Sequence, residues 1–330
     1  MNFFRPSFKA LVITGIAAAL LFTCGALFYA YLFGPAEPSG EKREFVVSPE
    51  DSLGEVAERL DSTGLVKNSW VFRFAYLRES GGKSIRPGGY ELSPSMDLWS
   101  VAHALTEKPY LSWVTIRPGW RKEQIATVLA KTLSWTPEQK QQWLTIDTAP
   151  SPSYVEGVYY PDTYLIPSDE TPFQVANRLR NRFAQMFSPY AEEAARQNIK
   201  WTTVLTIASL IEREAAGPDM KLIAGIMWNR LNRGMKLQID ATLQYVKGNE
   251  EDGWWGVVKS EDKYLDSPFN TYQHVGIPPH PIAQPSLAAI AAVLDPETTK
   301  CLFYLHDYKG MIHCSQNYSG HVANVNRYLK

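Results

Sequence analysis

The stretch WTTVLTIASLIEREAAG, residues 201–217, places two glutamates in an otherwise apolar segment with helical spacing. At about 100° per residue its apolar side chains form one stripe, and Glu212 and Glu214 fall on the two flanks of that stripe. Periodicity alone does not choose between them. Ile207 and Leu210 border Glu214, whereas small residues such as Ala208 border Glu212. A ligand therefore has more room beside Glu212.

A carboxyl on the border of an apolar surface loses solvation in its charged form, and this loss raises its pKa. A general acid that works near neutral pH needs such a shift. A glutamate on a helix edge is more commonly just solvated. This segment by itself therefore leaves both interpretations open.

The composition predicts an ordinary folded protein whose charges create no strong electrostatic field. The chain has 330 residues, 45% hydrophobic and 20% charged, enough for a core and for two domains. Its 33 basic and 34 acidic side chains nearly balance, so nothing draws in nucleic acid. Ten Trp and 17 Tyr are either core residues or surfaces on which sugar rings stack.

The N-terminal segment predicts a membrane anchor. Residues 10–36 carry no charge, and Arg5 and Lys9 precede them. A helix of about 20 apolar residues crosses a bilayer, and flanking cations favour the cytoplasmic side. We therefore expect residues 1–9 in the cytoplasm, residues 10–33 in the inner membrane and the rest outside it. A cleaved signal peptide is the alternative, but the apolar run is long and lacks a clear cleavage site.

The remaining chain predicts a linker and two α+β domains. Residues 34–44 are polar and contain Pro and Gly, which is typical of a linker. Residues 45–110 indicate a strand, two helices and a strand, the order of a LysM-like module that binds N-acetylglucosamine-containing glycans. Residues 111–330 indicate a larger domain of mixed helices and strands.

The three cysteines give information about the cellular compartment of the protein. Cys24 lies in the predicted anchor, whereas Cys301 and Cys314 flank LFYLHDYKGMIH, which indicates two strands around a turn at residues 307–310. If Leu305 faces Gly310, Cys301 falls opposite Cys314. A disulfide suits an oxidising compartment, and two unpaired thiols are the alternative.

Several motifs in the same order resemble one family. TIASLIEREA (206–215) and AGIMWNRLNRGMKLQIDATLQYVKG (224–248) resemble the MltG (YceG-like) family of endolytic murein transglycosylases. RPGGYELSPSMDLWSVAHAL (86–105), EGVYYPDTYLIP (156–167) and SPFNTYQHVGIPPHPIAQPS (267–286) agree with it in order. The resemblance runs from Phe45 to the C-terminus, and the family also has a single N-terminal anchor.

The resemblance implies a lytic transglycosylase that cuts nascent peptidoglycan strands internally and so limits their length. It would cleave the β-1,4 bond between N-acetylmuramic acid and N-acetylglucosamine without water, closing a 1,6-anhydro ring. Ordinary glycosidases need two carboxylates. Here one carboxyl suffices, because the muramyl C6 hydroxyl is the nucleophile, and we expect no metal and no cofactor.

The resemblance also implies the site residues. The family's catalytic glutamate falls on Glu212, and Glu214 is the second glutamate of its motif. We assign the glycan-binding groove to polar residues that match the family's motifs: Glu214, Gln238, Asp240, Asn270, Thr271 and Tyr272. Turn capping is the alternative role for Asp240 and Asn270. Two positions depart from the family, Ala241 for a proline and His280 for a glycine.

The expected partners are glycan strands, the inner membrane and, from the family, peptidoglycan synthases (penicillin-binding proteins). A non-catalytic, membrane-anchored peptidoglycan-binding scaffold is the main alternative. A metallohydrolase is disfavoured, because none of the six histidines forms an HExxH motif.

Overall fold

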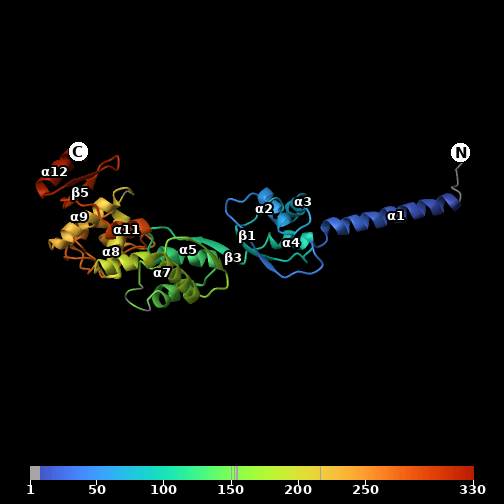
Figure 1. Ribbon diagram of the computed structural model, residues 1–330, viewed down its shortest axis with the longest axis horizontal. Coiled ribbons are helices and arrows are strands. Elements are labelled where there is room, and N and C mark those ends of the chain that lie inside the picture. Colours follow the sequence, from blue (N-terminus) through green and yellow to red (C-terminus); the bar gives the residue numbers. More distant parts are fainter. Residues whose placement is uncertain (1–7, 150, 152, 154, 216) are drawn as a thin grey trace. The chain divides into compact units, whose positions relative to one another are not determined.

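The computed structural model describes residues 8–149, 151, 153, 155–215 and 217–330 (Figure 1). By contacts the chain divides into two compact units, residues 1–113 with 165–168, and residues 114–164 with 169–330. Four strands form one sheet in the order β1-β2-β3-β4, with the bounds Arg43–Val47, Gly88–Leu92, Leu111–Thr115 and Thr163–Pro167. The chain passes from one unit to the other within β3 and again within β4.

The first unit begins with helix α1, Phe8–Phe33. Its part from Val12 to Phe33 is long and apolar enough to cross a membrane. The side chains from Val12 to Tyr31 are exposed, as expected for a helix whose surroundings are lipid.

The predicted strand–helix–helix–strand order is present after α1. Strand β1 leads into α2 (Leu53–Ser62) and α3 (Ser69–Ser80), and β2 returns antiparallel to β1, with Phe45 opposite Tyr90. Helix α4, Leu98–Ala104, follows. Side-chain caps start all three helices at Ser52, Asn68 and Asp97. One apolar core of β1, β2, α2, α3 and α4 unites these elements.

The second unit is mainly helical. Its elements are α5 (Lys122–Leu133), α6 (Pro137–Gln142), η1 (Trp143–Asp147), α7 (Pro172–Arg196), α8 (Trp201–Glu214), α9 (Met220–Asn232), α10 (Asp240–Lys247), η3 (Ser260–Tyr264), α11 (Leu287–Leu294) and α12 (Tyr318–Tyr328), with strands β5 (Phe303–His306) and β6 (Ile312–Ser315). Helix α8 contacts α7, α9, α10 and α11. Figure 1 shows α8, α9 and α11 close together.

Helix α8 is buried more completely than its sequence predicts. Helical periodicity assigns this helix one apolar stripe. In the structure every residue from Val204 to Ile211 is buried, including Thr206 and Ser209. The two hydroxyls donate to main-chain carbonyls within the helix, Thr206 to Thr202 at 2.9 Å and Ser209 to Thr206 at 2.8 Å. These bonds satisfy the polar groups that the surrounding helices remove from water.

The C-terminal hairpin has a different register from the predicted one. Leu305 pairs with His313 and His306 with Ile312, so Leu305 does not face Gly310. The Asp307 carboxylate stabilises the loop in this register, because it accepts hydrogen bonds from the amides of Lys309 and Met311. In this register Cys314 pairs with Tyr304, and Cys301 lies outside the strand ladder.

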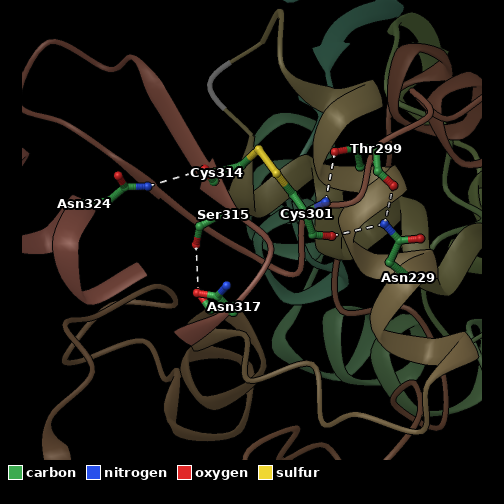
Figure 2. The surroundings of a disulfide bond; sticks show 7 residues. All are labelled: Asn229, Thr299, Cys301, Cys314, Ser315, Asn317 and Asn324. Carbon is green, nitrogen blue, oxygen red and sulfur yellow. Dashed lines mark hydrogen bonds between the residues drawn. A yellow bond between two sulfur atoms is a disulfide. The ribbon is translucent and has the colours of Figure 1, made fainter. Parts of the chain in front are cut away.

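Cys301 and Cys314 nevertheless form a disulfide, with their Cα atoms 5.9 Å apart (Figure 2). The Asn229 side chain of α9 donates to the carbonyls of Thr299 and Cys301 at 2.9 and 3.1 Å. The segment before β5 is therefore tied to α9, and the disulfide ties β6 to that segment. The unpaired-thiol alternative for these two residues is wrong.

Candidate active site

The Glu212 carboxylate is held by a residue that is distant in sequence. Its Oε2 accepts hydrogen bonds from the main-chain amide of Ser286 at 2.9 Å and from the Ser286 hydroxyl at 2.6 Å. Ser286 is also the N-cap of α11, where it accepts from the amide of Ala289. The positive end of the helix dipole therefore lies beside the carboxylate. Both bonds end on the same oxygen, so Oε1 can carry a proton.

A glycine lets the loop after β3 approach this carboxylate. Gly119 has φ +75°, and a Cβ there would lie 3.2 Å from Arg213 Nη1 and 3.8 Å from Glu212 Cγ. A side chain at this position would be strained by the positive φ and would crowd the Arg213 guanidinium. The Gly119 amide donates to the Gln284 carbonyl, and the Gln284 amide donates to the Trp120 carbonyl, both at 2.8 Å. Two loops thus meet beside Glu212.

A buried carboxyl, that of Glu156, holds one of these two loops in place. Glu156 is 1% exposed, and its carboxyl accepts hydrogen bonds from the Gln284 side chain and from the amide of Lys122. The Gln284 side-chain oxygen accepts from the amide of Tyr159 at 2.9 Å. Burial and the neighbouring Glu123 raise the pKa of Glu156. Glu156 thereby fixes Gln284, two residues before the serine that binds Glu212.

Glu214 lies in a different environment from Glu212. The Tyr304 hydroxyl of β5 donates to its Oε2 at 2.8 Å. Burial raises the pKa of Glu214, and the nearby Asp240 raises it further, against the lowering effect of the Tyr304 bond. Helical periodicity places the two glutamates symmetrically, but their partners differ. Glu212 lies at the N-terminus of α11, and Glu214 lies against Tyr304.

Arg213 separates the two glutamates and packs against an aromatic ring. Its guanidinium lies 4.0 Å from the ring centroid of Trp255. Burial lowers the pKa of Arg213, whereas Glu212 and Glu214 oppose that shift. Trp255 in turn donates from its indole nitrogen to the Gln124 side chain at 3.2 Å. The loop that contains Trp254 and Trp255 therefore borders the site.

Two of the predicted groove residues are buried and bonded within the chain. Asn270 is 0% exposed, and its side-chain nitrogen donates to the carbonyls of Lys263 and Leu265 at 3.2 and 2.8 Å. Thr271 is 2% exposed, and its hydroxyl accepts from the amide of Ile239 at 2.9 Å. Both side chains hold the backbone of neighbouring loops in place.

Three other predicted groove residues present polar atoms at the surface. Gln238 and Asp240 are exposed, and Tyr272 is partly buried. The Tyr272 hydroxyl donates to Asp240 Oδ1 at 2.6 Å. Gln238 has φ +55°, and its amide donates to the Thr271 carbonyl at 3.1 Å. The structure thus brings Asp240, Tyr272 and Glu214 into one cluster that the linear sequence does not show.

Both departures from the family pattern are accommodated. Ala241 is 2% exposed near the start of α10. His280 packs edge-on against Phe269, with ring centroids 4.8 Å apart, and burial lowers its pKa. His280 also lines a hollow of about 130 Å³ with residues of the N-terminal half of α8.

A second, aromatic hollow lies beside the meeting loops. It has a volume of about 480 Å³ and is lined by Trp120, Gln124, Thr127, Val128, Lys140, Glu250 and Trp254. Trp120 follows Gly119, and Trp254 precedes Trp255, whose ring lies against the Arg213 guanidinium. Among the described residues, no group of three or more His, Cys, Asp or Glu side chains is placed to hold a metal ion.

Sequence reasoning did not single out Ser286, Glu156 or Tyr304. Ser286 ends a Pro-rich segment and directly precedes an apolar helix, so an N-cap signal was present, but its bond to Glu212 was not. Glu156 begins the aromatic stretch EGVYYPDTYLIP, and an acid beside several aromatic residues is a signal for a buried carboxyl. No local pattern marks Tyr304.

Known proteins are similar to most of this chain. An endolytic murein transglycosylase of Streptococcus pneumoniae serotype 2 is 29% identical over 96% of this chain, and this chain spans 65% of its length. An endolytic murein transglycosylase of Bacillus subtilis is 26% identical over 91% of this chain and 90% of its own length.

A solved structure and a family model cover most of the chain. A crystal structure of a yceG-like protein from Listeria monocytogenes superposes with a TM-score of 0.58 and 25% identity over 86% of this chain and 99% of that one. The model of the YceG-like family matches residues 45–327, which include both glutamates and every residue of the site described above. The chain therefore belongs to the YceG-like family.

Proposed function

We propose that this protein is an endolytic lytic transglycosylase of peptidoglycan, with Glu212 as its acid and base. The observation that carries the proposal is the pair of hydrogen bonds from Ser286 to one oxygen of Glu212. They fix the carboxyl and leave the second oxygen for proton transfer. The relatives named as endolytic murein transglycosylases supply the substrate class.

The proposed reaction needs only one carboxyl. Glu212 donates its proton to the oxygen of the β-1,4 bond between N-acetylmuramic acid and N-acetylglucosamine, and the C1–O4 bond breaks. The muramyl C6 hydroxyl then bonds to C1, and its proton passes to the Glu212 carboxylate. The products are a 1,6-anhydromuramyl end and a free 4-hydroxyl, so Glu212 returns to its starting state and no water is consumed.

The Ser286 bonds hold the Glu212 carboxyl in one orientation through both halves of the reaction, so the same Oε1 can give the proton and then take it back. Glu214, with its raised pKa, is the alternative acid, and an experiment must separate the two.

Glycan binding is assigned to surface groups on two sides of the site. Gln238, Asp240 and Tyr272 offer amide, carboxylate and hydroxyl groups to sugar substituents, while Asn270 and Thr271 hold the loops that carry them. The tryptophan-lined hollow at Trp120 and Trp254 offers apolar ring faces to further sugars.

The cellular setting follows from the anchor. The uncharged part of helix α1 would cross the inner membrane with residues 1–9 in the cytoplasm, because Arg5 and Lys9 precede residue 10. The Cys301–Cys314 disulfide suits an oxidising compartment outside that membrane. The module at residues 45–110 would bind glycan as LysM-like modules do, and peptidoglycan synthases would be partners that supply nascent strands.

The test compares three full-length proteins on purified peptidoglycan, with products identified by mass. Wild type is expected to give anhydromuramyl ends, which are lighter than hydrolysed ends by one water. Glu212→Gln is expected to give none, because an amide cannot transfer the proton. Glu214→Gln is the matched control, because it makes the same change two residues further along α8. It should retain measurable activity.

The other outcomes are equally informative. Activity in Glu212→Gln with none in Glu214→Gln would assign the acid to Glu214. Hydrolysed ends would refute the non-hydrolytic reaction. A folded wild type that binds glycan without cutting it would favour the scaffold.

A further inference from the structure

Helix α3 of the first unit is apolar on two opposite faces. One face, with Phe72, Ala75 and Tyr76, is buried in the core of that unit. On the other face Trp70 is 73% exposed, Phe74 58% and Leu77 48%. We call these last three residues the outer stripe. Large apolar side chains gathered on one exposed face mark an interaction surface, so the outer stripe is a face that a partner would cover.

The charges of α3 are arranged around the outer stripe. At about 100° per residue the stripe is about 60° wide, with Arg73 on one flank and Arg78 on the other. Arg73 lies over the Trp70 ring, 4.9 Å from its centroid. Glu79, the acidic residue of α3, projects from the opposite side and bonds His103 at 2.8 Å. The face is therefore apolar in the middle and cationic at its edges.

The N-terminus of α3 is joined to the end of the predicted anchor. Lys67 Nζ donates to the Tyr31 carbonyl at 2.9 Å and lies 5.4 Å from the Tyr31 ring centroid. Lys67 directly precedes Asn68, the N-cap of α3.

A second contact joins the same unit to α1. Trp99 of α4 donates to the Tyr29 hydroxyl at 3.0 Å and stacks on Phe33, with centroids 5.6 Å apart. Both contacts lie in the last turns of α1. The outer stripe therefore begins within one helical turn of the residue that binds the anchor's outer end.

We propose that α3 lies on the outer surface of the membrane, with Trp70, Phe74 and Leu77 at the boundary between headgroups and acyl chains. Arg73, Arg78 and Lys67 would then contact anionic headgroups. Amphipathic helices bind interfaces in this way, with bulky apolar residues inward and basic residues at the edges. The inference rests on the proposed membrane anchor and not on the proposed reaction.

The consequence is a fixed position for the small module. The Lys67 and Trp99 contacts already join the unit to the end of α1. A further contact through α3 holds residues 45–110 against the bilayer, where newly made strands emerge.

The test measures quenching of tryptophan fluorescence by brominated acyl chains. Full-length protein is placed in lipid nanodiscs of phosphatidylcholine and phosphatidylglycerol, with and without bromine on the acyl chains. The difference between wild type and Trp70→Phe reports Trp70 alone. Trp113→Phe is the control, because Trp113 lies where the chain leaves this unit and its indole bonds the Val47 carbonyl.

We expect bromine to quench the Trp70 contribution by more than half, and the Trp113 contribution much less. Quenching should weaken in discs without the anionic lipid. An unquenched Trp70 would overturn the inference, and chemical crosslinks between two copies through this face would identify self-association instead. A chain that does not remain in discs would overturn both the anchor and this inference. The peptidoglycan assay of the Glu212 variant would be unaffected by either result.

Discussion

Ser286 binds Glu212 through both its amide and its hydroxyl, at 2.9 and 2.6 Å, across 74 positions of sequence. The same hydroxyl accepts from the Ala289 amide and so caps α11. One side chain thus starts a helix and orients the proposed acid. Any change at Ser286 affects both the stability of α11 and the position of the carboxyl.

Ser286→Ala is expected to lower kcat by about tenfold, which corresponds to about 1.4 kcal/mol of transition-state stabilisation. It should also lower the free energy of unfolding by about 1 kcal/mol through loss of the helix cap. Ser286→Thr keeps a hydroxyl and should restore most activity. Initial rates and denaturant unfolding measure the two effects.

The control for the cap is Ser52→Ala, which removes the equivalent cap of α2 in the other unit. It should reduce stability to a similar extent without lowering kcat. Equal loss of activity in Ser52→Ala and Ser286→Ala would mean that stability alone explains the effect.

Asn270→Ala and Tyr272→Phe should separate a supporting residue from a binding residue. Removal of the buried Asn270 amide leaves the carbonyls of Lys263 and Leu265 without this donor. We expect a loss of about 1–3 kcal/mol in the free energy of unfolding.

Tyr272→Phe removes a partly exposed hydroxyl that donates to Asp240. Here we expect KM for glycan strands to rise several-fold with little change in the unfolding midpoint. The reverse pattern, in which Asn270→Ala changes KM and leaves stability intact, would assign substrate contact to Asn270.

Glu156 should make the stability of the second unit depend on pH. Burial raises its pKa from 4.5 to about 8, so the folded state holds this proton more tightly than the unfolded state. The stabilisation from the bound proton is complete below the unfolded pKa and is lost as the pH rises through the folded pKa.

Wild type should therefore lose stability relative to Glu156→Gln between pH 4.5 and about 8, because the amide does not titrate. Thermal unfolding of both proteins from pH 4 to 9 measures the difference. Parallel curves over this range would show that Glu156 does not titrate there.

The Cys301–Cys314 disulfide should stabilise the C-terminal hairpin. The cysteines are 13 positions apart. Closing a loop of about this length contributes about 3 kcal/mol in the chain-entropy model. Replacing both by serine should lower the free energy of unfolding by that order, and reductant should have the same effect on wild type. Cys24→Ser is the control, because Cys24 is exposed and unpaired, and it should leave stability unchanged.

The sequence predicted the local elements well where one pattern dominated. The apolar run before residue 34 predicted α1, and the pattern of residues 45–110 predicted the strand–helix–helix–strand order of β1, α2, α3 and β2. The hairpin was predicted, but its register was wrong. Alternation of strand residues does not encode the two amide bonds that Asp307 accepts in the loop.

The two glutamates also show where local sequence patterns stop being informative. Helical periodicity placed Glu212 and Glu214 on the flanks of one stripe and could not rank them. Their environments come from Ser286 and Tyr304, which lie 74 and 90 positions later in the chain. Hydrogen bonds and burial from distant segments set a carboxyl's pKa, and no local pattern contains them.

The sequence by itself determined the apolar N-terminal helix, the strand–helix–helix–strand unit and the family, because these depend on apolar runs, caps and motifs along the chain. Only the tertiary structure decided which glutamate a helix N-terminus holds and that Glu156 is buried. It also decided that the outer stripe of α3 begins beside the end of α1. These facts depend on which distant segments pack together, since packing determines the solvation and the partners of each side chain.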